Sequence, residues 1–400
     1  MLINNKYTFL TLMLIFLSVF GMIGFRFLAH LKWLYYLVII AEIFSSMNKK
    51  DYFFKKPLIL FLICILVNGI ASSIRNDEPI LSFLDGESSI LIPFCMYFYF
   101  MKTKLSIDTL ENILIILCFI FCIAYIVQFV SFPKVIFQGA MAEGLDSELR
   151  FRLTGQCLGS LSFLLGMNKL LFGIRIKYVG LMVLGLLVTL ILGFRSQMVA
   201  LALSALFMFV RVKGLKIKSY LKYSLVSSVF IISFVQIPIV QNKIEEMFAR
   251  NETANFDNEN YIRLITYDYY VSELNKSPIS YIIGLGLPGS NSQYQRDTDR
   301  LKHFSGIIWA DWGLIGLSWM LGIPGTLIII YIFLRTFSIK VPKEYYYISF
   351  NFLFLILASL FTREIYRVGA FFIHAFLLML INKISILNNE RQDKSIVYKS

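Results

Sequence analysis

The stretch QRDTDRLKHFSGIIWADWGLIGL, from Gln295 to Leu317, decides how the chain must be organised. It begins as a charged run that favours water and continues as an apolar run rich in tryptophan and glycine. His303, one of only three histidines, stands at the boundary, and Asp311 lies inside the apolar run between Trp309 and Trp312. The stretch therefore predicts a long polar loop that returns to a membrane near His303.

Composition places most of the remaining chain in that membrane. Of 400 residues, 58% are hydrophobic and 16% are charged, which gives more apolar surface than a soluble core of this size could bury. Apolar stretches of about 17 to 22 residues recur, the length that a helix needs to cross a hydrocarbon core of about 30 Å. We expect an all-α integral membrane protein, a polytopic bundle of about twelve transmembrane helices. The predicted spans are 8–24, 28–46, 57–73, 86–101, 110–132, 153–172, 177–193, 196–211, 219–238, 313–336, 345–361 and 365–382.

The net charge of +13 could suit a nucleic-acid binder, but the positions of the basic residues indicate topology instead. They cluster in short connections that all fall on one side of the twelve-span arrangement, at 49–56, 102–104, 175–177, 211–222 and 340–343. By the positive-inside rule this side is cytoplasmic, with both termini there, and no nucleic-acid partner is expected. The five cysteines lie inside predicted spans without metal or redox spacing, as small packing residues.

The predicted organisation has one long polar segment. Helices 1 to 9 occupy 1–238, an extracytoplasmic loop 239–303, helices 10 to 12 304–382, and a cytoplasmic tail 383–400. A loop of this length rarely serves only as a connection, so it is the expected working surface.

Short helices are expected within this loop, at 240–251 and 257–276, the second stopped by Ser277-Pro278. Gly284, Gly286 and Gly289 then require a tightly turned backbone. In the bundle, the glycines and serines of the sixth span, 153–172, predict a helix that faces other helices rather than lipid.

Three segments carry a resemblance. LVTLILGFRSQMVALALSALF (187–207) is an apolar helix that turns at an arginine and restarts, NENYIRLITYDYYVSELNKSPISYIIGLGLPG (258–289) carries an arginine before a proline and a Gly-x-Gly turn, and HFSGIIWADWGLIGL (303–317) follows the long loop. In this order they resemble the bacterial O-antigen ligase and O-antigen or capsular polysaccharide polymerase family. These are membrane glycosyltransferases that use undecaprenyl-pyrophosphate-linked sugars.

The resemblance implies roles for individual residues. Arg195, Arg263 and Arg152 would bind the pyrophosphate, since a guanidinium can grip two phosphate oxygens at once. His303 and Asp311 would be catalytic, with the imidazole taking a proton from a sugar hydroxyl. Structural readings stay open: Arg195 could snorkel to the interface, Arg263 could be an ordinary exposed arginine, and His303 could be an interfacial polar residue.

The resemblance also implies the activity and its partners. The expected function is polymerisation of undecaprenyl-pyrophosphate-linked oligosaccharide repeat units on the extracytoplasmic face of a bacterial plasma (inner) membrane. Phe304 departs from the family's ligases, which often carry a small polar residue after the histidine. The resemblance favours polymerase over ligase, because the family's polymerases more often have this aromatic and highly hydrophobic character. The alternatives are an O-antigen ligase that transfers polymer to lipid A core, and a lipid-linked oligosaccharide flippase.

The expected partners are lipid-linked glycan donor and acceptor, membrane lipid and, in addition, a chain-length regulator. The sequence has no metal-ligand cluster or phosphate-binding loop, so neither a metal nor a cofactor is expected.

Overall fold

The computed structural model describes residues 4–16, 37, 40–45, 52–131, 134–137, 141–143, 150–214, 241, 262–274, 277–289 and 292–397. The predicted span 219–238 lies outside these residues, as does the predicted loop helix at 240–251 apart from residue 241. The predicted span 28–46 is described only at 37 and 40–45.

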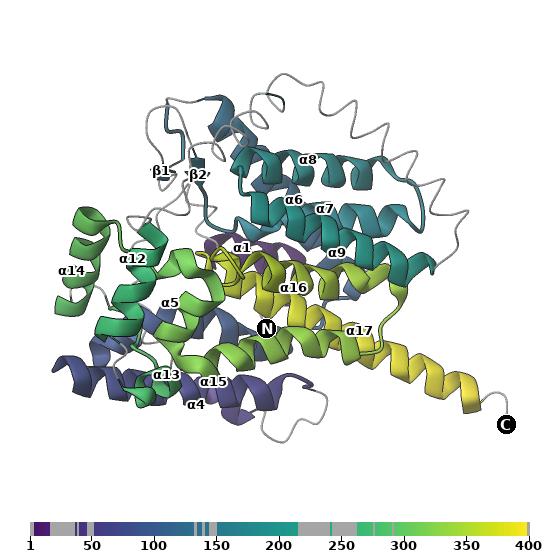
Figure 1. The fold of residues 1–400 in the computed structure, drawn as a ribbon. Coiled ribbons are helices and arrows are strands. Elements are labelled where there is room, and N and C mark those ends of the chain that lie inside the picture. Colours follow the sequence, from purple (N-terminus) through teal and green to yellow (C-terminus); the bar gives the residue numbers. More distant parts are fainter. Residues whose placement is uncertain are drawn as a thin grey trace.

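The described chain is predominantly helical, as predicted, and its long helices run roughly along one direction (Figure 1). The α-helices of the bundle are α1 Lys6–Phe16, α4 Lys55–Asn76, α5 Ile80–Phe100, α6 Ile107–Val130, α7 Cys157–Leu170, α8 Ile176–Leu192, α9 Arg195–Lys213, α15 Gly313–Arg335, α16 Tyr346–Ala358 and α17 Ala370–Val397.

Shorter elements gather at one end of the bundle, on the left of Figure 1, opposite the C-terminal end of α17. They are the antiparallel strands β1 Met141–Glu143 and β2 Arg150–Arg152, and the helices α12 Ile262–Asp268, η3 Tyr269–Leu274, α13 Pro278–Ile283, α14 Gln293–Arg300, η4 Leu301–Ser305 and η5 Trp309–Trp312. Short 3₁₀ turns connect the remaining helices: η6 Thr336–Ser338, η7 Lys343–Tyr345 and η8 Glu364–Tyr366.

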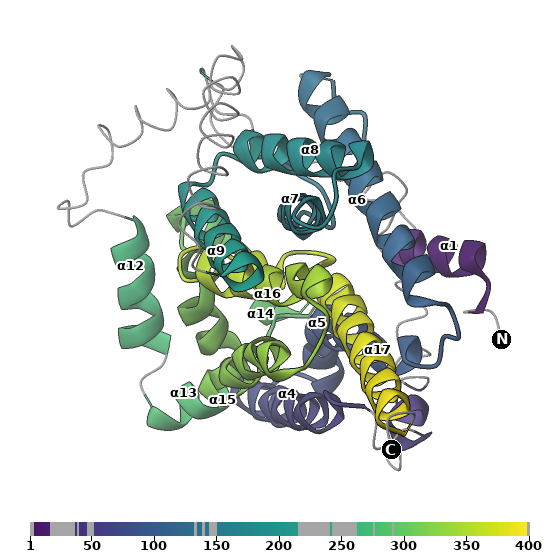
Figure 2. The same cartoon turned by 90° about the vertical axis from the view of Figure 1, so that its right-hand side faces the viewer.

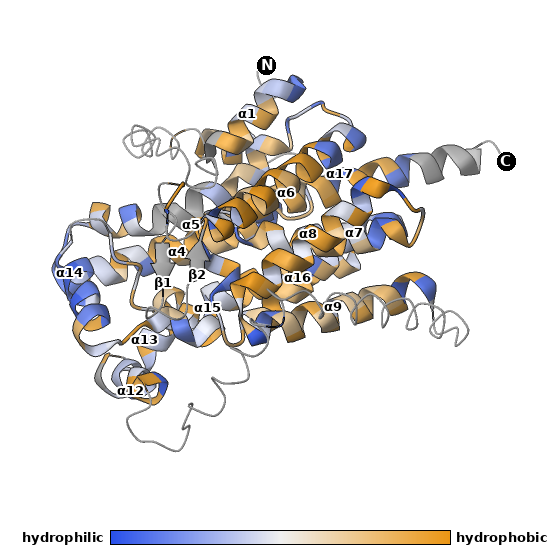
Figure 3. Ribbon diagram, turned by 90° about the horizontal axis from the view of Figure 1, so that it is seen from above, coloured by the Kyte–Doolittle hydropathy of each residue, from blue (hydrophilic) through white to orange (hydrophobic). Residues whose placement is uncertain are grey.

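Among the described residues, five helices are long and apolar enough to cross a membrane. They are Lys55–Asn76, Ile107–Val130, Arg195–Lys213, Trp309–Ser338 and Ala370–Glu390, and α8 is a shorter apolar helix. Apolar residues cover the sides of the bundle, whereas polar residues concentrate at its two ends, at α14 and at the far ends of α9 and α17 (Figure 3). A membrane protein is therefore indicated by length and composition together.

Two predicted spans correspond to short helices. α7 has 14 residues and α16 has 13, which at about 1.5 Å per residue gives only about 20 Å each. α7 begins late because residues 154–156 form a turn, and α16 ends early because the chain turns after Ser359.

The α7 helix is the centre of one group of helices and is seen end-on in Figure 2, surrounded by α6, α8, α9 and α16. Nearly all of its residues are buried. A Cβ on Gly166 would lie 2.7 Å from the backbone nitrogen of Met182, and one on Gly185 of α8 would lie 2.5 Å from the nitrogen of Phe163. The prediction that the glycine- and serine-rich span faces other helices is confirmed, because only small residues allow this approach.

The Gly284–Gly286 turn packs against α4 and α15. Both glycines have left-handed backbones, with φ of 87° and 84°, which confirms the predicted tight turn. The nitrogens of Leu285 and Gly286 donate to the carbonyls of Trp319 and Met320 at 2.7 and 2.9 Å. These carbonyls are available because α15 is kinked at Gly322, whose φ is 75°. The loop is thus hydrogen-bonded into the bundle, where irregular backbone is tolerated only if protein surrounds it.

Two polar side chains of α4 complete this contact. The Asn68 amide donates to the carbonyls of Ile283 and Met320 at 2.6 and 2.8 Å, and the Ser72 hydroxyl donates to that of Leu285 at 2.7 Å. The helical segment α12–η3 ends at Leu274, before Ser277-Pro278, as predicted. Pro278 also opens α13, where its missing N–H costs nothing.

Candidate functional site

The turn between α16 and α17, residues 363–369, lies at the end of the bundle that carries the short loop elements. The Ser359 hydroxyl accepts from the nitrogen of Ile365 at 2.9 Å, and the His374 Nε2 atom lies 3.0 Å from the Ile365 carbonyl. Gly369, with φ of 80°, ends the turn and lets α17 begin. Side chains from the end of α16 and from the first turns of α17 therefore hold the backbone of this turn.

Four buried polar side chains meet at this turn: Gln156, Gln197, Glu364 and Arg367, hereafter the Arg367 cluster. The Glu364 carboxylate accepts from the Gln197 amide and from the Arg367 Nε, and another Arg367 nitrogen donates to the Gln156 amide oxygen. Only 2% of Glu364 and 7% of Arg367 are exposed. Because Gln156 precedes α7 and Gln197 belongs to α9, the cluster joins three separate parts of the chain.

Arg367 and Glu364 form a buried ion pair. Burial raises the pKa of Glu364, while the positive charges of Arg367 and Arg363 and the Gln197 hydrogen bond oppose the rise. The Arg367 guanidinium also lies 5.0 Å from the centre of the Phe194 ring, a favourable cation–π geometry.

The Gln156 amide nitrogen is buried without a hydrogen-bond partner within the described part of the chain. A buried donor of this kind costs about 1 to 3 kcal/mol unless something accepts from it. The oxygen of the same amide accepts a hydrogen bond from Arg367, so the amide nitrogen lies near the Arg367 guanidinium. The arrangement suits an anionic oxygen, which would accept from both groups.

The predicted pyrophosphate ligand Arg195 lies beside this cluster. It is the first residue of α9, half-buried, between Phe194 and Gln197, which both contact cluster residues. α9 runs along α16 in Figure 2. The first turn of a helix carries free backbone N–H groups and the positive end of the helix dipole, so the surroundings of Arg195 favour an anion.

Backbone next to the predicted residues Asp311 and Arg263 is hydrogen-bonded, directly or through Trp312, to the other side of the same turn. The Tyr366 hydroxyl lies 3.0 Å from the carbonyl oxygens of both Ala310 and Gly313, which flank the η5 turn of Asp311. The Trp312 Nε1 donates to the carbonyl oxygen of Arg263 at 3.0 Å. Backbone segments bearing Asp311 and Arg263 are therefore linked to the turn that bears Arg367.

Asp311 occupies the 3₁₀ turn η5 directly before α15, and its side chain is exposed. The start of α15 at Gly313 agrees with the predicted span 313–336.

His303 lies on η4, and its side chain is exposed, as is that of Phe304. Gly306, which ends η4, approaches the Arg263 helix: a Cβ there would lie 3.2 Å from Ile262 Cδ1. Within the described structure no hydrogen bond or ion pair joins the imidazole to Arg195, Arg263 or Asp311. The backbone after His303 reaches the site, whereas the side chain faces outward.

Arg152 lies in β2, where its backbone pairs in register with Met141. The predicted phosphate contact of its side chain lies outside the described residues. The chain from Arg152 leads within four residues to Gln156, and the intervening Gly155 nitrogen donates to the Val368 carbonyl at 3.0 Å.

Glu364 and Arg367 were missed by the sequence analysis. Both occur in TREIYR (362–367), a charged run between two apolar spans. An ionisable pair so close to a membrane segment is a signal in itself, because such residues are costly there and usually functional or paired. No group of His, Cys, Asp and Glu residues that could hold a metal occurs among the described residues.

Neither a scan against protein-family models nor a search of curated proteins finds a match to this chain.

Proposed function

We propose that this chain is a bacterial membrane glycosyltransferase that polymerises undecaprenyl-pyrophosphate-linked oligosaccharide repeat units into a surface polysaccharide. It would lie in the plasma membrane with about twelve spans, both termini in the cytoplasm and the loop elements on the extracytoplasmic face. The proposal combines the sequence resemblance with the chemistry of the candidate site.

The observation that carries the proposal is the concentration of guanidinium groups around one buried carboxylate. Arg367 belongs to the Arg367 cluster, where it pairs with Glu364, and Arg195 lies next to the cluster at the start of α9. A pyrophosphate leaving group carries several negative charges, and fixed guanidinium groups bind such oxygens bidentately. These guanidinium groups and the buried Gln156 amide nitrogen, which has no partner in the described part of the chain, match this ligand class.

The proposed reaction is a direct displacement at the anomeric carbon of the donor. A hydroxyl oxygen of the acceptor repeat unit forms the new C–O bond, and the bond from the anomeric carbon to the pyrophosphate oxygen breaks. The electron pair leaves with undecaprenyl pyrophosphate, whose charge the arginines stabilise. His303 accepts the hydroxyl proton, and its exposure leaves it open to an acceptor. The configuration at that carbon is inverted.

Substitutions test the assigned residues. Arg195→Ala, Arg263→Ala and His303→Ala should each lower polymer synthesis by about 10²-fold or more, the usual loss when one transition-state contact is removed. Arg300→Ala is the matched control, because Arg300 is an exposed loop arginine that pairs with Asp297. Polymer is measured by glycan analysis at equal amounts of membrane protein. Full-length polymer at normal protein levels would eliminate the role of that residue.

Deletion of the gene separates the proposal from its alternatives. Loss of a polymerase leaves one repeat unit on the surface anchor. Loss of a ligase strands long polymer on undecaprenyl pyrophosphate, and loss of a flippase retains single units facing the cytosol. Either of the last two outcomes would overturn the polymerase assignment.

A further inference from the structure

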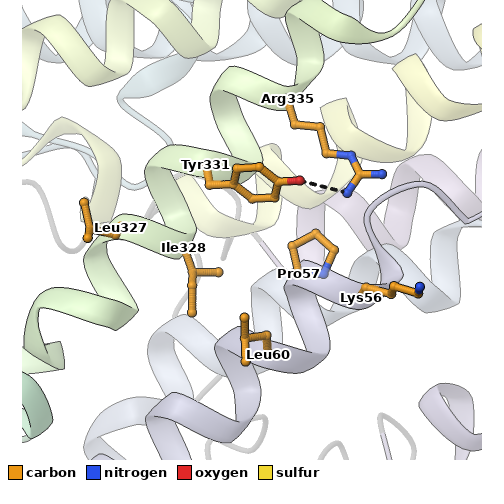
Figure 4. Close-up of a pocket in the computed structure, with 7 residues that line it drawn as sticks. All are labelled: Lys56, Pro57, Leu60, Leu327, Ile328, Tyr331 and Arg335. Carbon is orange, nitrogen blue, oxygen red and sulfur yellow. Dashed lines mark hydrogen bonds between the residues drawn. The ribbon is translucent and has the colours of Figure 1, made fainter.

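A second concave surface lies between α4 and α15, at the end of both helices remote from the candidate site. It encloses about 440 Å³ and is lined by Lys56, Pro57, Leu60, Leu327, Ile328, Tyr331 and Arg335 (Figure 4). We refer to it as the α4/α15 groove. The two helices run antiparallel here, since the first turns of α4 face the last turns of α15.

The groove separates charge from apolar surface along its length. Arg335 lies one turn beyond Tyr331 and two turns beyond Leu327, and Lys56 lies one turn before Leu60, so both cations fall at the same end. Leu60, Leu327 and Tyr331 are each more than half exposed. One end of the groove thus suits an anion and the other an apolar chain.

The cations are available to a ligand. Within the described part of the chain neither Lys56 nor Arg335 forms an ion pair, and the groove lining contains no acidic residue. An Arg335 terminal nitrogen donates to the Tyr331 hydroxyl at 3.3 Å, and the guanidinium lies 5.9 Å from the centre of the Tyr331 ring (Figure 4). This contact holds Arg335 over the groove before anything binds, which lowers the entropy lost on binding.

We propose that the α4/α15 groove binds an anionic phospholipid, with its head-group phosphate between Lys56 and Arg335 and an acyl chain along Leu60 and Leu327. Three features favour a lipid: the charge complementarity, the order of the charged and apolar parts, and the outward-facing apolar surface of a membrane helix pair. The lipid bridges α4 and α15, the helices that also clamp the Gly284–Gly286 turn. By holding α4 and α15 together at their remote ends, the lipid stabilises their packing around the Gly284–Gly286 turn.

Thermal unfolding of the purified full-length protein in a neutral detergent tests the proposal. Phosphatidylglycerol should raise the unfolding temperature by several degrees, and phosphatidylcholine at the same mole fraction should raise it much less. The preference is the ratio of the apparent affinities for phosphatidylglycerol and phosphatidylcholine that these shifts give. In the Lys56→Gln, Arg335→Gln double variant this ratio should fall by about 10-fold or more, because each basic residue near an anionic surface contributes about fivefold. Lys104→Gln with Arg175→Gln, which neutralises two exposed cations elsewhere, should keep the preference.

Several outcomes would overturn the proposal. The first is the same lipid preference in the double variant and in the wild type. The second is an increase in unfolding temperature with inorganic phosphate as large as that with phosphatidylglycerol. The third is a wild-type dimer that becomes monomeric in the double variant, which would make a second copy of the chain the occupant of the groove. If the double variant does not fold, the single variants serve, with an expected loss of about fivefold each. The result is independent of the proposed glycosyl transfer, because none of these readouts measures polymer.

Discussion

Glu364 is the residue whose charge state should be visible in the stability of the whole protein. Since burial raises its pKa above the ordinary value of 4.5, the folded protein binds more protons than the unfolded chain between these two values. The stabilisation is fully present below pH 4.5 and is lost as the pH rises through the raised pKa. We expect the stability of the wild type relative to Glu364→Gln to decrease over this window. Thermal unfolding from pH 4 upward measures the decrease.

A matched control separates this effect from general acid sensitivity. Glu344 is an exposed carboxylate outside the Arg367 cluster, so Glu344→Gln should follow the wild-type curve. A constant difference between wild type and Glu364→Gln at every pH would contradict the expectation.

A second buried pair, at the remote end of the bundle, makes a prediction about stability alone. The Lys169 ammonium lies 2.7 Å from the Glu111 carboxylate, and both residues are 8% exposed. Glu111→Ala would leave Lys169 buried without its partner, which costs about 3 to 5 kcal/mol. Lys102→Ala should cost under about 1 kcal/mol, because its pair with Glu42 is more exposed. Unfolding by denaturant in mixed micelles compares the two losses, and similar values would argue against a buried charge at Lys169.

At the residue scale the sequence predicted what is local and missed what depends on long-range contacts. Arg195 was placed correctly at a turn between two apolar helices, since the Gly193 break and both helices are local features. Arg367 was not identified, because its importance comes from Gln156, a residue 211 positions away.

The Gly284–Gly286 turn is an element that a single methyl group should disrupt. A Cβ on Gly286 would lie 2.3 Å from the Ser72 hydroxyl oxygen, and the φ of 84° disfavours any other residue. We expect Gly286→Ala to lower the free energy of unfolding by about 2 kcal/mol or more. Gly173→Ala is the matched control, because no atom lies within 4 Å of its added Cβ. Thermal unfolding of both variants checks the prediction, and equal unfolding temperatures would contradict it.

The elements themselves were predictable to different degrees. The long apolar helices follow from composition, and the helix at 262–268 was predicted within 257–276. The kink of α15 at Gly322 was not predicted, because a glycine in an apolar run is ordinary in a membrane helix. Pro324 lacks the N–H that would bond the Met320 carbonyl, and the turn at Gly284–Gly286 supplies a donor to this carbonyl and to that of Trp319. Strands β1 and β2 were also missed, since each has only three residues.

For the whole molecule, the proposed orientation makes a direct prediction. Reporters fused near Lys216 and Asn291 should lie on opposite sides of the membrane, because the basic connections are expected in the cytoplasm and the polar loop outside it. Each position is fused in turn to two complementary reporters, alkaline phosphatase, which is active outside the cytoplasm, and green fluorescent protein, which is fluorescent inside it. Agreement between the two positions would invalidate the topology.

The bond between Asn68 and Ile283 joins residues 215 positions apart, which has a consequence for biosynthesis. A ribosome adds about 5 to 20 residues each second, so Asn68 leaves it about 10 to 40 s before Ile283 does. During that interval the α4 helix holds an amide and a hydroxyl in or near hydrocarbon without their final acceptors. The nascent chain therefore needs a temporary shelter for these groups, from water at the translocation channel or from a membrane chaperone, until the rest of the polypeptide arrives.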